Sequence, residues 1–220
     1  MKTRPAEIEN GSMAIITEEL RARGIALPPE NAAVILRCIH ASADFDYDGN
    51  LRFTSGAVEA GVKALRRGAE IVTDTNMALA GISRPGLQRL GGAAYCFMAD
   101  ERIAEAARVN GTTRAVAAVD WAAAQHPAAI LAIGNAPTAL MRIAEKIETG
   151  LRPALVIGAP VGFVNVVESK ARALEVCEKY GVPAIVALGR KGGSSIAAAV
   201  CNALLYTAAD MLDPKERGWQ

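Results

Sequence analysis

The chain contains two histidines, and their surroundings suggest different chemistry. His40 ends the apolar segment PENAAVILRCIH, and Arg37 three residues earlier would lie on the same face of a helix. A neighbouring cation lowers the pKa of an imidazole and can also bind an acidic substrate. His40 is therefore a candidate proton donor, although a lone histidine is more often structural. His126, in Ala-Gln-His-Pro, is expected to cap a helix end at the surface.

Four polar segments follow predicted strands and are the other candidate binding elements. They are TDTNM (73–77), IGNAPT (133–138), GAPVGF (158–163) and GRKGGSS (189–195). Ligands of open parallel sheets bind beyond the carboxyl ends of the strands. Helices that start there present N–H groups without intrahelical partners, which favour anions. Together these segments suit a ligand with several carboxylates or phosphates, while ordinary turn chemistry is the alternative for any single one.

Sequence motifs for metals and nucleotides do not occur. Cys38, Cys96, Cys177 and Cys201 are widely spaced and form no CxxC pair, so we expect reduced, mostly buried thiols and no metal site. Neither GxGxxG nor GxxxxGK followed by Ser or Thr is present. An enzyme acting on nucleotides or sugar phosphates, with GRKGGSS as its phosphate loop, stays as an alternative.

Composition and charge narrow the class of protein. The 220 residues are 51% hydrophobic but only 5% aromatic, so the core must consist of aliphatic side chains, as in helices packed on a parallel sheet. A net charge of +1 gives no general attraction to nucleic acid or to an anionic membrane. The start, MKTRPAEIEN, has no apolar stretch, and no segment reaches the roughly 18 apolar residues of a membrane helix. We expect a cytoplasmic protein.

From residue 69 onward, short β-branched runs alternate with helical segments. The predicted strands are 69–73, 94–98, 129–133, 154–157 and 183–188, and the predicted helices are 101–108, 114–125, 138–149, 164–178 and 195–206. Pro137 suits a first helical turn, and Gly68, Gly150 and Gly181 suit helix ends. Residues 1–65 read as helices at 5–23, 30–41 and 55–67 with a short strand at 51–53. The pattern predicts one domain over 1–220, a three-layer α/β/α fold with a mostly parallel central sheet and an N-terminal helical region.

Several phrases of the sequence resemble the precorrin-8X methylmutase family and its cobalt-dependent counterpart. The matching stretches are IENGSMAII (8–16), RCIHASADF (37–45), IVTDTNMALAGI (71–82), AIGNAPTAL (132–140), PALVIGAPVGFVNVVESK (153–170) and GRKGGSSIAAAVCNALL (189–205). They span nearly the whole chain in order. The phrase TDTNMALAGI is more similar to the cobalt-dependent members.

The resemblance implies an isomerase of cobalamin biosynthesis that is a homodimer without a dissociable cofactor. Its reaction shifts a methyl group on ring C to the neighbouring ring carbon, giving hydrogenobyrinic or cobyrinic acid. The resemblance assigns catalysis to His40 and substrate contacts to Ser12, Arg37 and Arg114. From the strand-end segments we add six candidate contacts to the substrate carboxylates: Thr75, Asn135, Thr138, Lys191, Gly192 and Ser194.

This function fits what the residues themselves indicate. A tetrapyrrole is a flat apolar macrocycle edged with carboxylates, and a sigmatropic methyl shift needs no nucleophile, metal or redox partner. An imidazole that donates a hydrogen bond or proton to the ring C nitrogen would favour the product-like state. The rival from another class is a corrinoid carrier without turnover, which needs the carboxylate contacts but not the proton donor.

Overall fold

The structure, a computed structural model, describes residues 4–218, in which strands and helices alternate along the chain. The strands are β1 (Leu51–Phe53), β2 (Ile71–Thr73), β3 (Ala94–Cys96), β4 (Ile130–Ile133), β5 (Leu155–Gly158) and β6 (Ala184–Ala187). The helices are α1 (Pro5–Ala22), α2 (Pro29–Ser42), α3 (Tyr47–Asn50), α4 (Ala57–Arg66), α5 (Asn76–Gly81), α6 (Arg84–Leu90), α7 (Glu101–Val109), α8 (Arg114–Gln125), α9 (Pro137–Glu148), α10 (Val166–Tyr180), α11 (Ser194–Ala208) and the 3₁₀ turn η1 (Pro214–Arg217).

The six strands form one sheet in the order β1-β6-β5-β4-β2-β3. All neighbouring pairs are parallel except β1 with β6, which is antiparallel and aligns Leu51 with Ala187. The chain passes from β2 outward to β3 and then returns past β2 to β4. The strand order therefore reverses between β2 and β4, which is where open sheets usually bind ligands.

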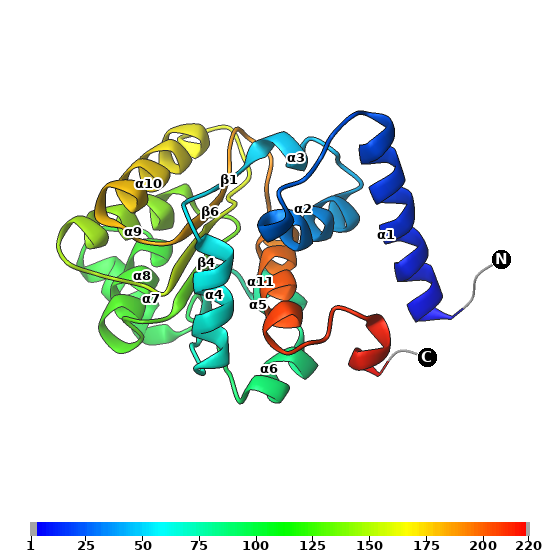
Figure 1. The fold of residues 1–220 in the computed structure, drawn as a ribbon. Helices are drawn as coiled ribbons and strands as arrows, with labels where there is room; N and C mark the ends of the chain where they lie inside the picture. Colours follow the sequence, from blue (N-terminus) through cyan, green and yellow to red (C-terminus); the bar gives the residue numbers. More distant parts are fainter. Residues whose placement is uncertain (1–3, 219–220) are drawn as a thin grey trace.

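Helices cover both faces of the sheet, so the predicted three-layer α/β/α fold is confirmed (Figure 1). One face packs against α2, α4 and α11, and the other against α8, α9 and α10. Successive strand residues point to opposite faces. The first face receives Ile71, Ile130, Leu155 and Ile185, and the second receives Val72, Leu131, Val156 and Val186.

Most predicted elements are present with boundaries that differ by at most two residues, because their local signals are strong. Helix α9 begins at Pro137, and α10 ends at Gly181 with a left-handed φ of 67°. Four short elements were not predicted: α3, α5, α6 and η1. They span four to seven residues, too few for a helical period to be recognised in the sequence.

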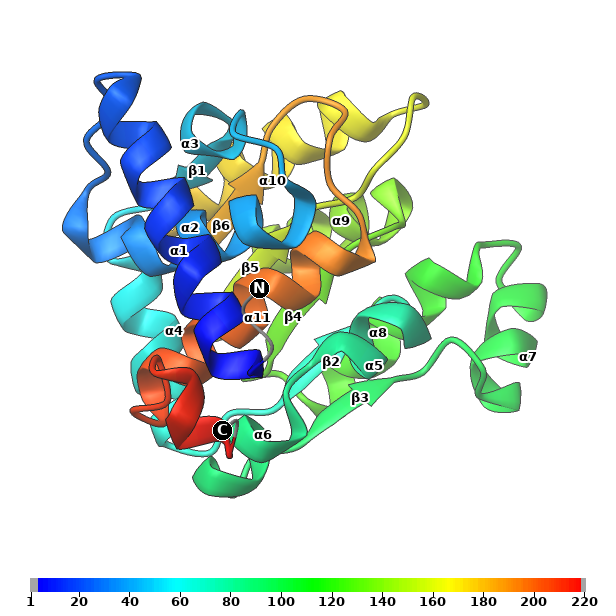
Figure 2. The same cartoon turned by 90° about the vertical axis from the view of Figure 1, so that its right-hand side faces the viewer.

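The N-terminal helices lie outside the βα alternation and meet the end of the chain. α1 packs against α2, and η1 packs against α1 (Figure 2). In the same view α7 lies on the side of the molecule away from α1. Within residues 4–218, no helix is long and apolar enough to cross a membrane.

Candidate functional site

The carboxyl ends of β2 and β4 are joined by the side chain of Asp74. This carboxylate accepts hydrogen bonds from the N–H groups of Gly134 (2.8 Å), Asn135 (2.8 Å) and Ala136 (2.7 Å). Asp74 is 5% exposed. Burial raises the pKa of Asp74, and the three N–H donors act in the opposite direction.

Two backbone N–H groups of the predicted 135–138 segment are therefore bound within the protein, and the predicted substrate contacts of Asn135 and Thr138 stay predictions for their side chains. The N–H groups of Asn135 and Ala136 already have an anionic partner within the protein, since Asp74 occupies the position that a ligand carboxylate would take. The side chains of Asn135 and Thr138 are exposed. Thr138 Oγ1 lies 3.3 Å from Thr113 Oγ1, so the first turns of α9 and α8 meet at this edge.

Thr75 and Ser194 come together at the same edge. Their hydroxyl oxygens are 2.7 Å apart, and Thr75 Oγ1 also caps α5 by accepting from Ala78 N at 3.0 Å. Gly134 allows this approach, because a Cβ there would lie 2.7 Å from Ser194 Cα. We call Asp74, Thr75, Gly134 and Ser194 the strand-end cluster.

His40 lines a different pocket, of about 340 Å³, built by α1, α2, α11 and η1. Glu9 also lines this pocket. Its carboxylate accepts hydrogen bonds from Arg37 at 2.8 Å and from Arg217 at 2.6 Å. The ring of Tyr206 packs against both guanidinium groups, and its centroid lies 5.2 Å from Arg37 Cζ and 4.4 Å from Arg217 Cζ. We call Glu9, Arg37, His40 and Arg217 the histidine cluster.

Charge in the histidine cluster is largely compensated internally. Burial alone would raise the pKa of Glu9, but the hydrogen bonds from Arg217 and Arg37 lower it below its ordinary value. Two guanidinium groups against one carboxylate leave one positive charge. Arg37, which was predicted to contact an acidic substrate, pairs with Glu9 and shares this carboxylate with Arg217.

The pKa of His40 is lowered, as the sequence predicted. Burial is the main cause and Arg37 adds to it, while Glu9 acts in the opposite direction. Near neutral pH the imidazole is therefore mostly uncharged. In that form it can donate one hydrogen bond, and when protonated it is a stronger acid than an ordinary histidine.

The loop from 189 to 193 leads from β6 to α11 and ends directly before Ser194 of the strand-end cluster. Lys191 Nζ pairs with Asp44, just beyond α2, at 2.7 Å and also with Asp46. Its charge is thus compensated within the protein, and the predicted contact of Lys191 with a substrate carboxylate stays a prediction. Gly192 is required by close packing, since a Cβ there would lie 2.3 Å from the carbonyl oxygen of Ala159.

The remaining predicted residues lie on neighbouring elements. Ser12 is half-buried on α1, three residues after Glu9 and so on the same helical face. Arg114 is the exposed first residue of α8, next to Thr113. The structure thus places Ser12 beside the histidine cluster and Arg114 near the strand ends.

Exposed apolar side chains rim the carboxyl edge of the sheet. Met77 follows β2, Met141 lies in the helix after β4, and Val161, Phe163 and Val164 follow β5. Phe163 is 82% exposed and Val164 77%. Such a rim, next to polar and cationic groups, suits a large apolar ligand with charged edges.

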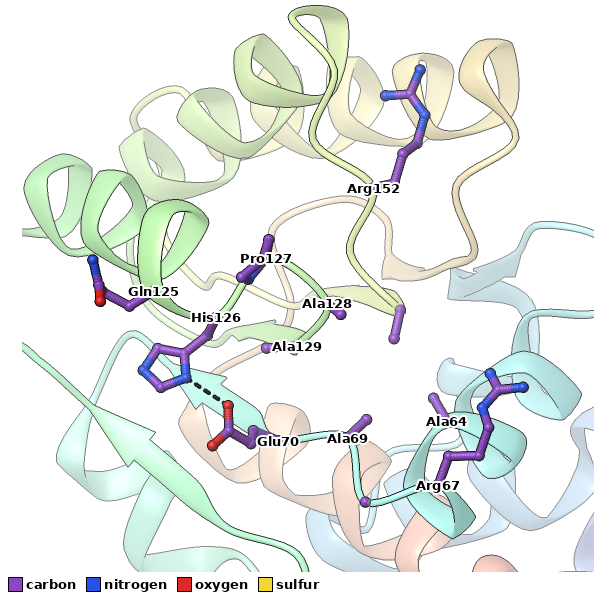
Figure 3. Close-up of a pocket in the computed structure, with 12 residues that line it drawn as sticks. Ala64, Arg67, Ala69, Glu70, Gln125, His126, Pro127, Ala128, Ala129 and Arg152 are labelled. Carbon is purple, nitrogen blue, oxygen red and sulfur yellow. Dashed lines mark hydrogen bonds and ion pairs between the residues drawn. The ribbon is translucent and has the colours of Figure 1, made fainter.

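A pocket of about 580 Å³ lies at the opposite, amino-terminal ends of β2, β4 and β5 (Figure 3). His126 lines it, with Nδ1 2.5 Å from Glu70 Oε2 and its ring stacked on Phe97. His126 is the C-terminal cap residue of α8, as predicted, but through its backbone N–H; its imidazole is largely buried rather than at the surface and pairs with Glu70. Because this pocket lies away from the strand carboxyl ends, we assign it no part in the site.

Sequence reasoning missed Glu9, Asp74, Arg217 and Tyr206. Glu9 and Asp74 lie within IENGSMAII and TDTNM, so their segments were identified but not their roles. Arg217 and Tyr206 had no local signal. The four cysteines are free, as predicted, and three of them are buried. Among residues 4–218, no group of three His, Cys, Asp or Glu residues could hold a metal ion.

Comparisons with known proteins agree on one family. The sequence profile described as precorrin-8X methylmutase matches residues 7–207. A cobalt-precorrin-8 methylmutase of Salmonella typhimurium is 43% identical, covering 92% of this chain and 95% of its own. A precorrin-8X methylmutase of Pseudomonas aeruginosa is 38% identical, covering 88% and 91%. The crystal structure of a Thermus thermophilus precorrin-8x methyl mutase superposes with a TM-score of 0.82 at 41% identity, covering 93% and 98%.

Proposed function

Because the chain belongs to the precorrin-8X methylmutase family, we propose that it is an isomerase catalysing the methyl-migration step of cobalamin biosynthesis. The methyl group on ring C moves to the neighbouring ring carbon of the same molecule. One carbon–carbon bond breaks and one forms, and no atom or electron enters or leaves. Catalysis therefore requires tighter binding of the product-like conjugation than of the substrate.

His40 is the proposed donor to the ring C nitrogen. The observation that carries this role is its position in the pocket of the histidine cluster, which the apolar Ile8 and two guanidinium groups also line. A hydrogen bond or proton at that nitrogen stabilises the rearranged conjugation as it forms. The other imidazole, His126, belongs to the Glu70 pair at the far end of the strands.

The substrate carboxylates are proposed to bind at both clusters. Arg37 and Ser12 serve the ring held near His40, and Arg217 joins them as a second cation that shares Glu9. Arg114, Asn135 and Thr138 serve the edge beyond β4. Thr75, Ser194 and Gly192 shape the floor at the strand ends, and Lys191 keeps the loop before Ser194 in place through Asp44.

The natural substrate is proposed to be the cobalt-bound form. Two observations support this choice. The phrase TDTNMALAGI is similar to the cobalt-dependent members, and relatives named cobalt-precorrin-8 methylmutase are 42% and 43% identical to the chain. Assays with cobalt-precorrin-8 and metal-free precorrin-8X in parallel test it, and a higher kcat/KM for the metal-free form would refute it.

Residues 1–220 are proposed to act as one domain and to pair as a homodimer. Helices from the two ends of the chain share one core, where Cys38 of α2 and Cys201 of α11 are both buried. The pocket beside His40 measures about 340 Å³, at the lower end of the range for small ligands, so a macrocycle needs further walls. A second copy supplies them most simply by two-fold symmetry. A fully active monomer in sedimentation experiments would end this proposal.

Replacing His40 with Ala tests the function directly. We expect kcat to fall by roughly 10²- to 10⁴-fold, the usual contribution of a positioned acid, while folding and corrinoid affinity are largely retained. His126→Ala is the matched control and should be close to silent in the same absorbance assay. A His40→Ala variant that turns over at the parent rate would exclude the donor role. A parent protein that binds the corrinoid without turnover would favour the carrier.

A further inference from the structure

Lys170, in α10, is a fully buried cation that the function described above does not use. Its residue exposure is 0%, and Nζ donates to the carbonyl oxygens of Gly189 at 2.9 Å and Lys191 at 2.7 Å. Within residues 4–218 it forms no ion pair with a carboxylate. A buried ammonium without counter-charge is costly, and burial lowers the pKa of Lys170 to about 8.

Lys170 binds the carbonyl oxygens of Gly189 and Lys191. Each carbonyl shares a peptide unit with the N–H group of the next residue, so this contact fixes the direction of the N–H groups of Arg190 and Gly192. Every peptide bond described is trans, so each N–H points away from its own carbonyl and hence away from Lys170. Neither N–H has a hydrogen-bond partner in the described part of the chain, whereas Gly193 N donates to Ala159 O at 2.8 Å.

The same loop is held rigidly beside the proposed site. Gly192 of the loop packs against the backbone of Ala159. Ser194, the first residue after the loop, forms a hydroxyl–hydroxyl hydrogen bond with Thr75 of the strand-end cluster. On its other side Lys191 contacts Asp44, beyond the end of α2. The side-chain charge of Lys191 is compensated there. Among the described residues, Arg190 on the loop and Lys170 behind it form no ion pair with a carboxylate, and of these two only Lys170 is fully buried.

We propose that Lys170 is a positioning residue for substrate binding. Its ammonium fixes and polarises the loop 189–193, so that the N–H groups of Arg190 and Gly192 receive one carboxylate of the tetrapyrrole. The side chain of Arg190 stacks over exposed Phe163 at 5.5 Å, which places an apolar surface next to this carboxylate position. The proposal rests on the proposed function, since it specifies how one loop of that site binds its ligand.

The test compares a charged and an uncharged form of the same ligand. Affinities for cobyrinic acid and for its fully methyl-esterified derivative are measured by absorbance for the parent and for Lys170→Met, which keeps the length of the side chain but not its charge. We expect the variant to bind the acid about ten- to a hundred-fold more weakly, as for loss of a charge-assisted interaction, and the ester with parent affinity. KM should rise with kcat nearly unchanged. Lys179→Met, an exposed position on the same helix, is the control and should change neither affinity.

Two results would overturn the proposal. Equal losses for the acid and the ester would mean that Lys170 only supports the loop, and an unchanged affinity for the acid would mean that it has no part in binding. If the parent binds neither compound, the proposed function fails separately. The loop is then judged by whether inorganic sulfate shifts the amide NMR resonances of Arg190 and Gly192 in the parent but not in Lys170→Met. The absence of a shift in the parent would end the proposal.

Discussion

The two clusters of the site each contain a buried carboxylate, Glu9 or Asp74, and each is 5% exposed. Their donors are different. Glu9 is held by two guanidinium groups from distant parts of the chain, whereas Asp74 is held by three backbone N–H groups of one turn. The pKa of Glu9 is lowered and that of Asp74 is raised, although both are hidden from water.

This difference indicates separate tasks for the two regions. In the histidine cluster, charged side chains set the electrostatics around His40, so that region should respond strongly to pH and to changes of charge. In the strand-end cluster, a carboxylate fixes the backbone and brings the ends of β2 and β4 together. Substitutions that break the hydrogen bonds of this turn should therefore affect that region more than substitutions that only remove a charge.

Replacing Glu9 with Gln is expected to have the largest effect on stability, about 3–5 kcal/mol, because two buried guanidinium groups lose their counter-charge. The folded pKa of Glu9 is lowered, so its contribution is present above the unfolded value near 4.5 and is lost as pH falls through the folded value. Denaturant unfolding at several pH values should show this acid-side loss in the parent and not in the variant. Glu7→Gln, exposed on the same helix, is the control. If Glu9→Gln were as stable as the parent, the electrostatic task assigned to the histidine cluster would be contradicted.

Replacing Asp74 with Asn should cost less, about 3 kcal/mol, although the side-chain shape is retained. The amide NH₂ must face at least one N–H donor, leaving buried donors without an acceptor. Thermal or denaturant unfolding of Asp74→Asn measures the loss, with Asp48→Asn as the control. A change below 1 kcal/mol would show that the strand ends do not depend on this carboxylate.

The third comparison separates the two clusters by ligand binding. Arg37→Ala and Arg114→Ala should each weaken corrinoid binding about ten- to a hundred-fold, or 1.5–3 kcal/mol, if each holds a carboxylate. Only Arg37→Ala removes a cation beside His40, so only it should raise the pKa of His40 and move the alkaline limb of the kcat profile to higher pH. Identical profiles for the two variants would remove the distinction between the clusters.

What the sequence predicts well in this protein is local. Pro137, Gly181 and the β-branched runs set their own elements, because caps and periodicity act over a few residues. Arg37 and His40 are recognisable for the same reason, being one helical turn apart. The partners of the site are not local: Asp74 meets residues 60 to 62 positions later, and Arg217 meets Glu9 across 208. No periodicity connects such residues, so the sequence identifies Arg37 and Lys191 as candidate substrate contacts but does not reveal that the fold pairs each of them with a carboxylate.

The contact between Arg217 and Glu9 also sets when the protein becomes competent during its synthesis. The helices and the sheet can assemble as they leave the ribosome, but the pocket beside His40 gains its second guanidinium group only after residue 217 has emerged. Glu9 in α1, which is synthesised early, therefore lacks one of its two cationic partners while the residues between them are being made.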